Sequence, residues 1–459
     1  MSLYLDRIER YDGILRSYIT VLGERALAQA KVAEIEIGKG NYRGVLHGIP
    51  FGVKDQLYTR GIRTTLGSRI LQDFVPDQDA TVIQRLEAAG AILLGKHNLH
   101  EFGKGGTIDF PFGQPRNPWD ISRTPASSST GSGIAPAAGL CSGALGNDTG
   151  GSIRWPAAAN GIVGLRPTFG RVSRHGGLMF GWNADTIGPM GRRVFDCAAL
   201  LQAIAGHDPG DALSARVPVP DYVSALDGDL RGVRIGLIRE MTWVDGMHPA
   251  VRAAMEASVR VLRSLGATVE EMSLSLAKYA VPLQMLTTDA DVASVFLRKW
   301  LRTDWERFDK GTRSRLATAC RVPAPIYNRA MRARVLVRQE MLDAFKTFDA
   351  LITATHLQPA PSIAKSRETV GNDTDMLERV LRRRISTWPF SGANVPAIAL
   401  PNGFTDDPLP MPVSLQIASR PFSETVVLKI AHAYEQATGW HARHPDLALT
   451  TRAQTAPVA

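Results

Sequence analysis

Cysteine is scarce in this sequence, and long apolar runs are missing altogether. Only three cysteines occur in 459 residues, Cys141, Cys197 and Cys320, and they lie far apart. So sparse a set forms neither a disulfide framework nor a Cys-x-x-Cys metal site, and we therefore expect a reducing, cytoplasmic setting. No stretch of 18 apolar residues occurs, so no membrane-spanning helix is expected. Residues 1–10 mix charged with apolar side chains and lack the apolar segment of a secretory signal.

Runs of like charge are also missing. Lys and Arg number 53 against 44 Asp and Glu, a net charge of +9, but no block of five or six like charges occurs. The excess would permit an anionic partner, yet nothing here resembles a nucleic-acid-binding tail. With 44% hydrophobic and 21% charged residues, the composition excludes disordered and collagen-like classes.

Two common catalytic patterns are absent as well. No Gly-x-Ser-x-Gly elbow occurs, which argues against an α/β-hydrolase. The ten histidines form no His-Glu-x-x-His pattern, and the pairs His97/His100 and His441/His444 lack a third ligand. We expect neither a metal nor a cofactor.

Helices and short apolar strands alternate along the chain. This alternation predicts an α/β fold with a large central sheet covered by helices on both faces. We expect one domain over 1–459, with a mostly helical, Arg-rich excursion at about 279–335. Helices are predicted within 1–38, after an N-cap at Asp79, and over 248–265, 338–345 and 424–438; strands are predicted at 51–53, 91–94, 233–238, 268–269, 350–355, 397–400 and 413–417.

Glycine is concentrated in one segment. Fifteen of the 42 glycines fall between Gly131 and Gly191. They would serve either tight packing of helices on a sheet or a loop whose N–H groups bind an anion. Ser152, directly after Thr149-Gly150-Gly151, lies where several N–H groups could converge, as an acyl-transfer nucleophile requires.

A serine nucleophile needs a base, and no histidine stands in a suitable context. Lys54 ends an apolar strand, and burial would lower its pKa toward that of a working base. The alternative is a lysine that pairs with the adjacent Asp55.

These segments together resemble the amidase signature family of serine amidohydrolases. The similarity covers roughly residues 3–445 and is weakest from 210 to 345. It is carried by Gly-Val-Lys54-Asp, Arg116-Asn-Pro-Trp-Asp120, the serine cluster 127–129, Gly146-Asn-Asp-Thr-Gly-Gly-Ser152-Ile-Arg154, Gly161-Ile-Val-Gly-Leu-Arg-Pro-Thr168, Asp185-Thr-Ile-Gly-Pro-Met190, Pro396-Ala-Ile-Ala-Leu-Pro401 and Tyr434-Glu-Gln-Ala-Thr-Gly439.

The resemblance implies an amidase signature fold and a Ser-cisSer-Lys triad. Ser152 would be the nucleophile, Ser128 the bridging serine after a cis Ser127–Ser128 peptide, and Lys54 the neutral base. The oxyanion hole would come from the N–H groups of Thr149, Gly150, Gly151 and Ser152. Phe102 and Gly103 would line the acyl side, and the turn 174–177 and the helices of 279–335 would shape the entrance over the active site. The chain departs from the family at Ser127, where glycine is usual, and at Asn147, where threonine is usual.

Several activities are compatible with this triad. A free-standing amidase acting on a linear amide is favoured. The alternatives are a carbamate or ester hydrolase of the same mechanism, the glutamine-hydrolysing A subunit of a tRNA amidotransferase, and a catalytically silent assembly subunit. The Leu-Gly-Thr-Tyr-type segment of the amidotransferase branch is missing around 313–325. We expect a small-molecule amide or carbamate substrate, no membrane and no nucleic acid, and leave a homodimer open.

Overall fold

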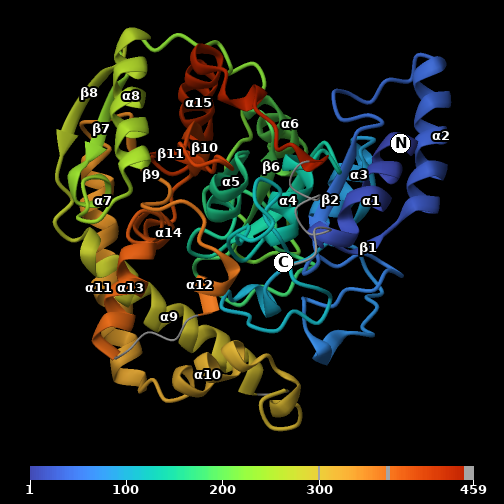
Figure 1. The fold of residues 1–459 in the computed structure, drawn as a ribbon, viewed down its shortest axis with the longest axis horizontal. Helices are drawn as coiled ribbons and strands as arrows, with labels where there is room; N and C mark the ends of the chain where they lie inside the picture. The colour runs from blue at the N-terminus through green and yellow to red at the C-terminus, as the bar shows by residue number, and fades with distance from the viewer. Residues whose placement is uncertain (298–299, 368–372, 449–459) are drawn as a thin grey trace.

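The computed structural model describes residues 1–297, 300–367 and 373–448, and one mixed sheet runs through this part of the chain (Figure 1). Its 11 strands follow the order β1-β3-β2-β4-β6-β5-β10-β11-β9-β7-β8. The strands are β1 (Tyr18–Val21), β2 (Pro50–Lys54), β3 (Ile92–His97), β4 (Gly143–Asp148), β5 (Val163–Arg166), β6 (Thr186–Gly191), β7 (Arg234–Ile238), β8 (Thr268–Met272), β9 (Ala350–Ala354), β10 (Ala397–Phe404) and β11 (Pro412–Ser419).

Helices pack on both faces of this sheet, and the α/β fold class is confirmed. They are α1 (Ser2–Leu15), α2 (Gly23–Gly38), α3 (Thr81–Ala88), α4 (Thr130–Ala137), α5 (Arg154–Asn160), α6 (Val194–Ile204), α7 (Arg239–Thr242), α8 (Pro249–Ser264), α9 (Ala277–Leu297), α10 (Lys310–Ala319), α11 (Ala324–Ala344), α12 (Ile363–Arg367), α13 (Asp373–Arg384), α14 (Trp388–Ala393) and α15 (Glu424–Thr438). Among the described helices, none combines the length and apolarity needed to cross a bilayer.

The main core lies between the sheet and helices α3, α6, α8 and α15. Because side chains alternate along a strand, Leu93 of β3 enters this core while Ile92 and Leu94 enter a second cluster under α1, α2 and α4. Burial on both faces explains why these strands are almost continuously apolar.

β2 is the parallel strand that delivers the predicted base. It pairs in parallel with β3 on one side and with β4 on the other. Parallel neighbours end at the same edge of a sheet, so Lys54 at the end of β2 and the loop that follows β4 reach the same edge. That edge carries the candidate site.

The predicted helical excursion contains α9, α10 and most of α11, apart from residues 298–299, which lie outside the described part. Helix α9 packs against both α10 and α11, at the lower left of Figure 1.

Two local predictions were wrong. Residues 1–38 are not all helical, because Tyr18–Val21 forms β1 and pairs with β3. This run of one aromatic and three β-branched residues favours a strand but is too short to stand out between two helices. Asp79 does not cap α3, whose N-cap is Ala80. Its carboxylate instead accepts a hydrogen bond from the N–H of Arg60, at 2.7 Å.

Candidate active site

Lys54 lies at the end of a central strand and is fully buried. Its Nζ lies 2.9 Å from the Oγ of Ser128. Burial lowers the pKa of Lys54 to about 7, against the opposing influence of Asp185 and Asp148. A lysine with this pKa is neutral in a large fraction of molecules near pH 7, as a general base must be.

The carboxylate next to Lys54 in sequence belongs to another lysine. Asp55 forms a buried ion pair with Lys96 at 3.1 Å and also accepts hydrogen bonds from the N–H and hydroxyl of Thr65. Successive residues of an extended chain point in opposite directions, so Asp55 faces away from Lys54. The ion-paired interpretation of Lys54 is therefore wrong for this neighbour, and the fully buried Lys96 went unnoticed in the sequence.

The three consecutive serines occupy different surroundings. The Ser127–Ser128 peptide is cis, as the resemblance implies. Ser128 is fully buried and contacts Lys54, whereas the Oγ of Ser129 bridges the backbone N–H and carbonyl of Asn147 on β4. The structure therefore places Ser128, and not Ser129, beside the predicted base.

Ser152 follows β4 in a loop that leads directly into α5. It is partly exposed, unlike Lys54 and Ser128. The N–H of Ser129 donates to the carbonyl of Ser152 at 3.3 Å, which joins this loop to the loop of Ser128. A partly exposed serine against a buried serine and lysine is the order that a nucleophile, a relay and a base require.

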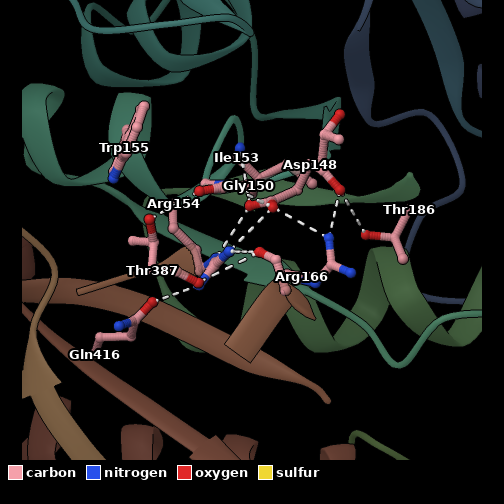
Figure 2. A network of polar contacts seen from close by, with 12 residues as sticks. Asp148, Gly150, Ile153, Arg154, Trp155, Arg166, Thr186, Thr387 and Gln416 are labelled. Carbon is pink, nitrogen blue, oxygen red and sulfur yellow. Dashed lines mark hydrogen bonds and ion pairs between the residues drawn. The ribbon is translucent and has the colours of Figure 1, made fainter. Parts of the chain in front are cut away.

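A buried carboxylate holds the loop before Ser152 in shape, as Figure 2 shows. Asp148 accepts hydrogen bonds from the N–H groups of Gly151 and Ile153, at 2.7 and 3.2 Å, and pairs with Arg154 and Arg166. Although burial opposes ionisation, the two guanidinium groups hold the pKa of Asp148 well below its usual range. A permanently charged Asp148 therefore fixes both ends of the Gly151–Ile153 segment.

Residues from distant segments hold the carbonyls of the same loop. Gln284 of α9 donates to the carbonyl of Thr149 at 2.7 Å, and Thr387 donates to the carbonyl of Gly150 at 2.8 Å. In a trans peptide the N–H points opposite to the C=O. Gln284 therefore aims the N–H of Gly150 away from α9, while Thr387 helps to aim the N–H of Gly151 at Asp148.

The hydrogen bond from the N–H of Gly151 to Asp148 bears on the predicted oxyanion hole. Because the N–H of Gly151 already donates to Asp148, it is not free to bind a developing oxyanion. The predicted donors that remain are the N–H groups of Thr149, Gly150 and Ser152.

The two residues predicted to line the acyl side, Phe102 and Gly103, have different surroundings. The ring of Phe102 is buried among Phe180, Phe296, Trp300 and Phe308, so it packs in an aromatic cluster. Gly103 has φ +70°, and a Cβ there would lie 3.5 Å from the Nζ of Lys54 and 3.8 Å from the Oγ of Ser128. Gly103 thus borders the base and the relay. In the turn 174–177, Gly177 bridges Leu57, three residues beyond Lys54.

A cavity of about 1060 Å³ opens beside these loops. Ser127 and Trp155 are among its lining residues, whereas Lys54, Ser128, Ser152 and Phe102 are not. The indole of Trp155 packs against Gly151, and that of Trp388 packs against Gly150. No group of three or more His, Cys, Asp or Glu suited to a metal occurs among the residues that the structure describes.

Sequence reasoning named Lys54, Ser128 and Ser152 but missed the residues that hold the loop before Ser152. Thr387, Trp388 and Gln284 lie in segments without a motif of their own, and only the fold brings them to the loop.

Comparison with known proteins identifies the family and the fold. A family model described as Amidase matches residues 1–428. The A subunit of glutamyl-tRNA(Gln) amidotransferase from Moorella thermoacetica is 40% identical, over 97% of this chain and 94% of that protein. Among solved structures, native peptide amidase from Stenotrophomonas maltophilia has a TM-score of 0.81 at 33% identity and covers 96% of this chain and 93% of its own. A chain of a vestigial protein complex, solved to trace the evolutionary origins of an s-triazine catabolic enzyme, has a TM-score of 0.87 at 31% identity, with 95% and 94% covered.

Proposed function

The chain belongs to the Amidase family, and on that premise we propose that it hydrolyses a C–N amide-type bond through an acyl-enzyme on Ser152. The observation that carries the proposal is the 2.9 Å contact between buried Lys54 and buried Ser128, in a loop that the N–H of Ser129 joins to the loop of partly exposed Ser152. It also argues against a silent assembly role, because a buried lysine with no carboxylate partner among the described residues is costly to keep without a use.

The proposed reaction follows from this arrangement. Neutral Lys54 takes the proton of Ser128 while Ser128 takes that of Ser152, whose Oγ bonds to the amide carbon. The N–H groups of Thr149, Gly150 and Ser152 hold the oxyanion. When the C–N bond breaks, the relay returns the proton to the leaving nitrogen. Water then cleaves the acyl-enzyme ester by the same relay, which frees the acid and restores Ser152.

The second part of the proposal concerns the substrate and whether the chain works with partner subunits. The 40% identity to an amidotransferase A subunit over 97% of the chain supports glutamine hydrolysis with partner subunits more than the free-standing amidase that the sequence pattern favoured. The 33% identity to a peptide amidase keeps the free-standing enzyme as the second candidate. Carbamate and ester hydrolysis need the same triad and are tested alongside.

A hydrolysis screen separates these candidates. The purified chain is assayed with L-glutamine, a primary amide, an anilide, a carbamate and an ester, and a fluorophosphonate probe reports whether Ser152 is reactive. Glutamine turnover that depends on co-purified partner subunits supports the amidotransferase setting, whereas turnover by the chain alone supports a free-standing enzyme. No labelling and no turnover, with or without partners, would reject the hydrolase.

A further inference from the structure

Three hydrogen-bond donors next to the nucleophile loop have no acceptor. They are the indole N–H groups of Trp155 and Trp388 and the Nε–H of Arg384, all buried atoms without a hydrogen-bond partner among the described residues. Unpaired buried donors are uncommon in folded proteins and often mark a place where a ligand or water completes the bonding. All three are donors, so the missing group is an acceptor.

These three donors belong to one neighbourhood. The guanidinium carbon of Arg384 lies over both indole rings, 5.9 Å from the centroid of Trp155 and 5.4 Å from that of Trp388. A Cβ on Gly150 would lie 2.5 Å from the indole of Trp388, and one on Gly151 would lie 3.0 Å from that of Trp155. The guanidinium is therefore about one indole ring away from the loop that ends in Ser152.

The charge of Arg384 is not neutralised within the described residues. Among the residues whose side chains the structure describes, which leave out 373–377 and 379, no carboxylate lies within ion-pair distance of Arg384. The nearby Asp289 pairs with Lys104 and with Arg315, at 2.8 Å each. The hydrogen bond that Arg384 makes in this part of the chain runs from Nη1 to the carbonyl of Val380, at 3.3 Å. Burial, with the repulsion of Arg315 and Arg383, lowers the pKa of Arg384 to about 9.

This cationic group faces open space. Trp155 and Arg384 both line the cavity of about 1060 Å³, together with Arg382 and Arg383 of the same helix end. A planar guanidinium held against aromatic rings can bind both oxygens of a carboxylate with little loss of side-chain freedom. The cavity thus offers an unpaired cation, unpaired donors and room for a small molecule.

We propose that Arg384, with the indole N–H of Trp155, binds a carboxylate of the substrate, so that this enzyme acts on short amides that carry a carboxylate group. The inference rests on the proposed amide hydrolysis and adds its substrate class. The short path from the guanidinium to Ser152 limits the spacer between carboxylate and scissile amide to a few carbon atoms.

The test compares matched substrates. Succinamate and glutaramate carry a carboxylate, whereas succinamide and butyramide are neutral and similar in size. The expected ratio of kcat/KM for glutaramate over butyramide is about 10- to 150-fold, since a charged hydrogen bond contributes roughly 1.5–3 kcal/mol. In Arg384→Met the ratio falls at least tenfold, and in Arg384→Lys it falls by an intermediate amount. Arg231→Met is the control, because Arg231 is exposed, pairs with Asp229 and does not line the cavity; it leaves the ratio near that of the wild type.

The outcomes distinguish the two levels of the proposal. Suppose that fluorophosphonate labels Ser152 but the wild-type enzyme cleaves butyramide and glutaramate with equal kcat/KM. The carboxylate site is then refuted and the hydrolase stands, and the same holds if Arg384→Met leaves the ratio unchanged. If the probe does not label and no amide is cleaved, the proposed function itself fails. Binding of glutaramate to the Ser152→Ala variant, measured by the quenching of tryptophan fluorescence, checks the site without turnover. Loss of that binding in the Ser152→Ala/Arg384→Met double variant supports the site, and its retention overturns it.

Discussion

Asp55 forms its ion pair with Lys96, at 3.1 Å inside the protein, and faces away from its sequence neighbour Lys54. Two buried lysines at one edge of the sheet thus have opposite chemistry. Lys96 has an anionic partner, a carbonyl and a hydroxyl around its ammonium group, whereas Lys54 contacts the Oγ of Ser128. Burial lowers the pKa of both lysines, but at Lys96 the contacting carboxylate of Asp55 opposes this shift, whereas Lys54 has a hydroxyl as its contact.

Removing the partner of Lys96 should destabilise the fold without changing the base. Asp55→Asn leaves the ammonium group of Lys96 buried and unpaired, so we expect a loss of about 3–5 kcal/mol in the free energy of unfolding. The double variant Asp55→Asn/Lys96→Met should lose less than the two single variants combined, because it removes both charges. Urea unfolding measures both. If the double variant loses as much as the sum, the two residues are not coupled.

The pH profile of activity should report the pKa of Lys54. The base works in its neutral form, so kcat/KM should rise with pH and level off above the pKa, which is about 7. Between pH 6 and 8 the increase should be about tenfold. Asp55→Asn should not move the midpoint, since Asp55 does not face Lys54. A flat profile from pH 6 to 9, with the chemical step limiting, would contradict Lys54 as base.

Ser152→Ala should remove turnover and fluorophosphonate labelling together. We expect kcat to fall by at least about a thousandfold, because covalent catalysis is lost. Ser152 is partly exposed, so the unfolding midpoint should remain that of the wild type. Wild-type rates in this variant would exclude Ser152 as nucleophile.

The serine cluster offers an internal control. Ser128→Ala should lower kcat by at least about a hundredfold through loss of the proton relay. Ser127→Ala should cost far less, since the contact with Lys54 belongs to Ser128. Equal losses in the two variants would mean that the loop conformation matters and the Ser128 hydroxyl does not.

Replacing Gln284 should lower kcat more than it changes KM. Gln284→Leu releases the carbonyl of Thr149 and with it the direction of the Gly150 N–H, and we expect a loss of about 10- to 100-fold in kcat. Gln339→Leu is the matched control, because Gln339 is exposed on α11 and bonds only to Asp343 within the described structure. A change in KM alone would show that Gln284 shapes substrate binding and not the oxyanion hole.

The sequence predicts the local parts of this site well and its long-range parts poorly. Lys54 ends an apolar strand and Ser152 follows a glycine pair, so chain-local patterns suffice to find both. The strand β1 depends on pairing with β3, far along the chain, and no local periodicity encodes that pairing. The partners of Asp148 lie nearer in the sequence, but no spacing pattern predicts that Arg154 and Arg166 turn toward it. Strands β4, β5 and β6 could not be predicted from the sequence for another reason. Glycine-rich runs such as Gly143–Asp148 carry few of the side chains that are typical of a strand.

The roles of Gly151 and Phe102 show the same limit. The resemblance implies an N–H donor and a pocket wall, but the orientation of a peptide or a ring depends on neighbours such as Asp148 and Phe296. These neighbours are visible only in three dimensions.

The anchors of the nucleophile loop bear on when this enzyme becomes active during its synthesis. All three triad residues have been added to the chain once Ser152 is made, yet the carbonyl anchors come 135 and 237 residues after their partners, at Gln284 and Thr387. Strand β10, which pairs with β5 in the middle of the sheet, is made later still. A nascent or truncated chain therefore holds every reactive group but lacks the parts that aim its oxyanion donors. On the proposed mechanism, we therefore expect a chain that is still being synthesised to react with amides only after its C-terminal half has been added and has folded.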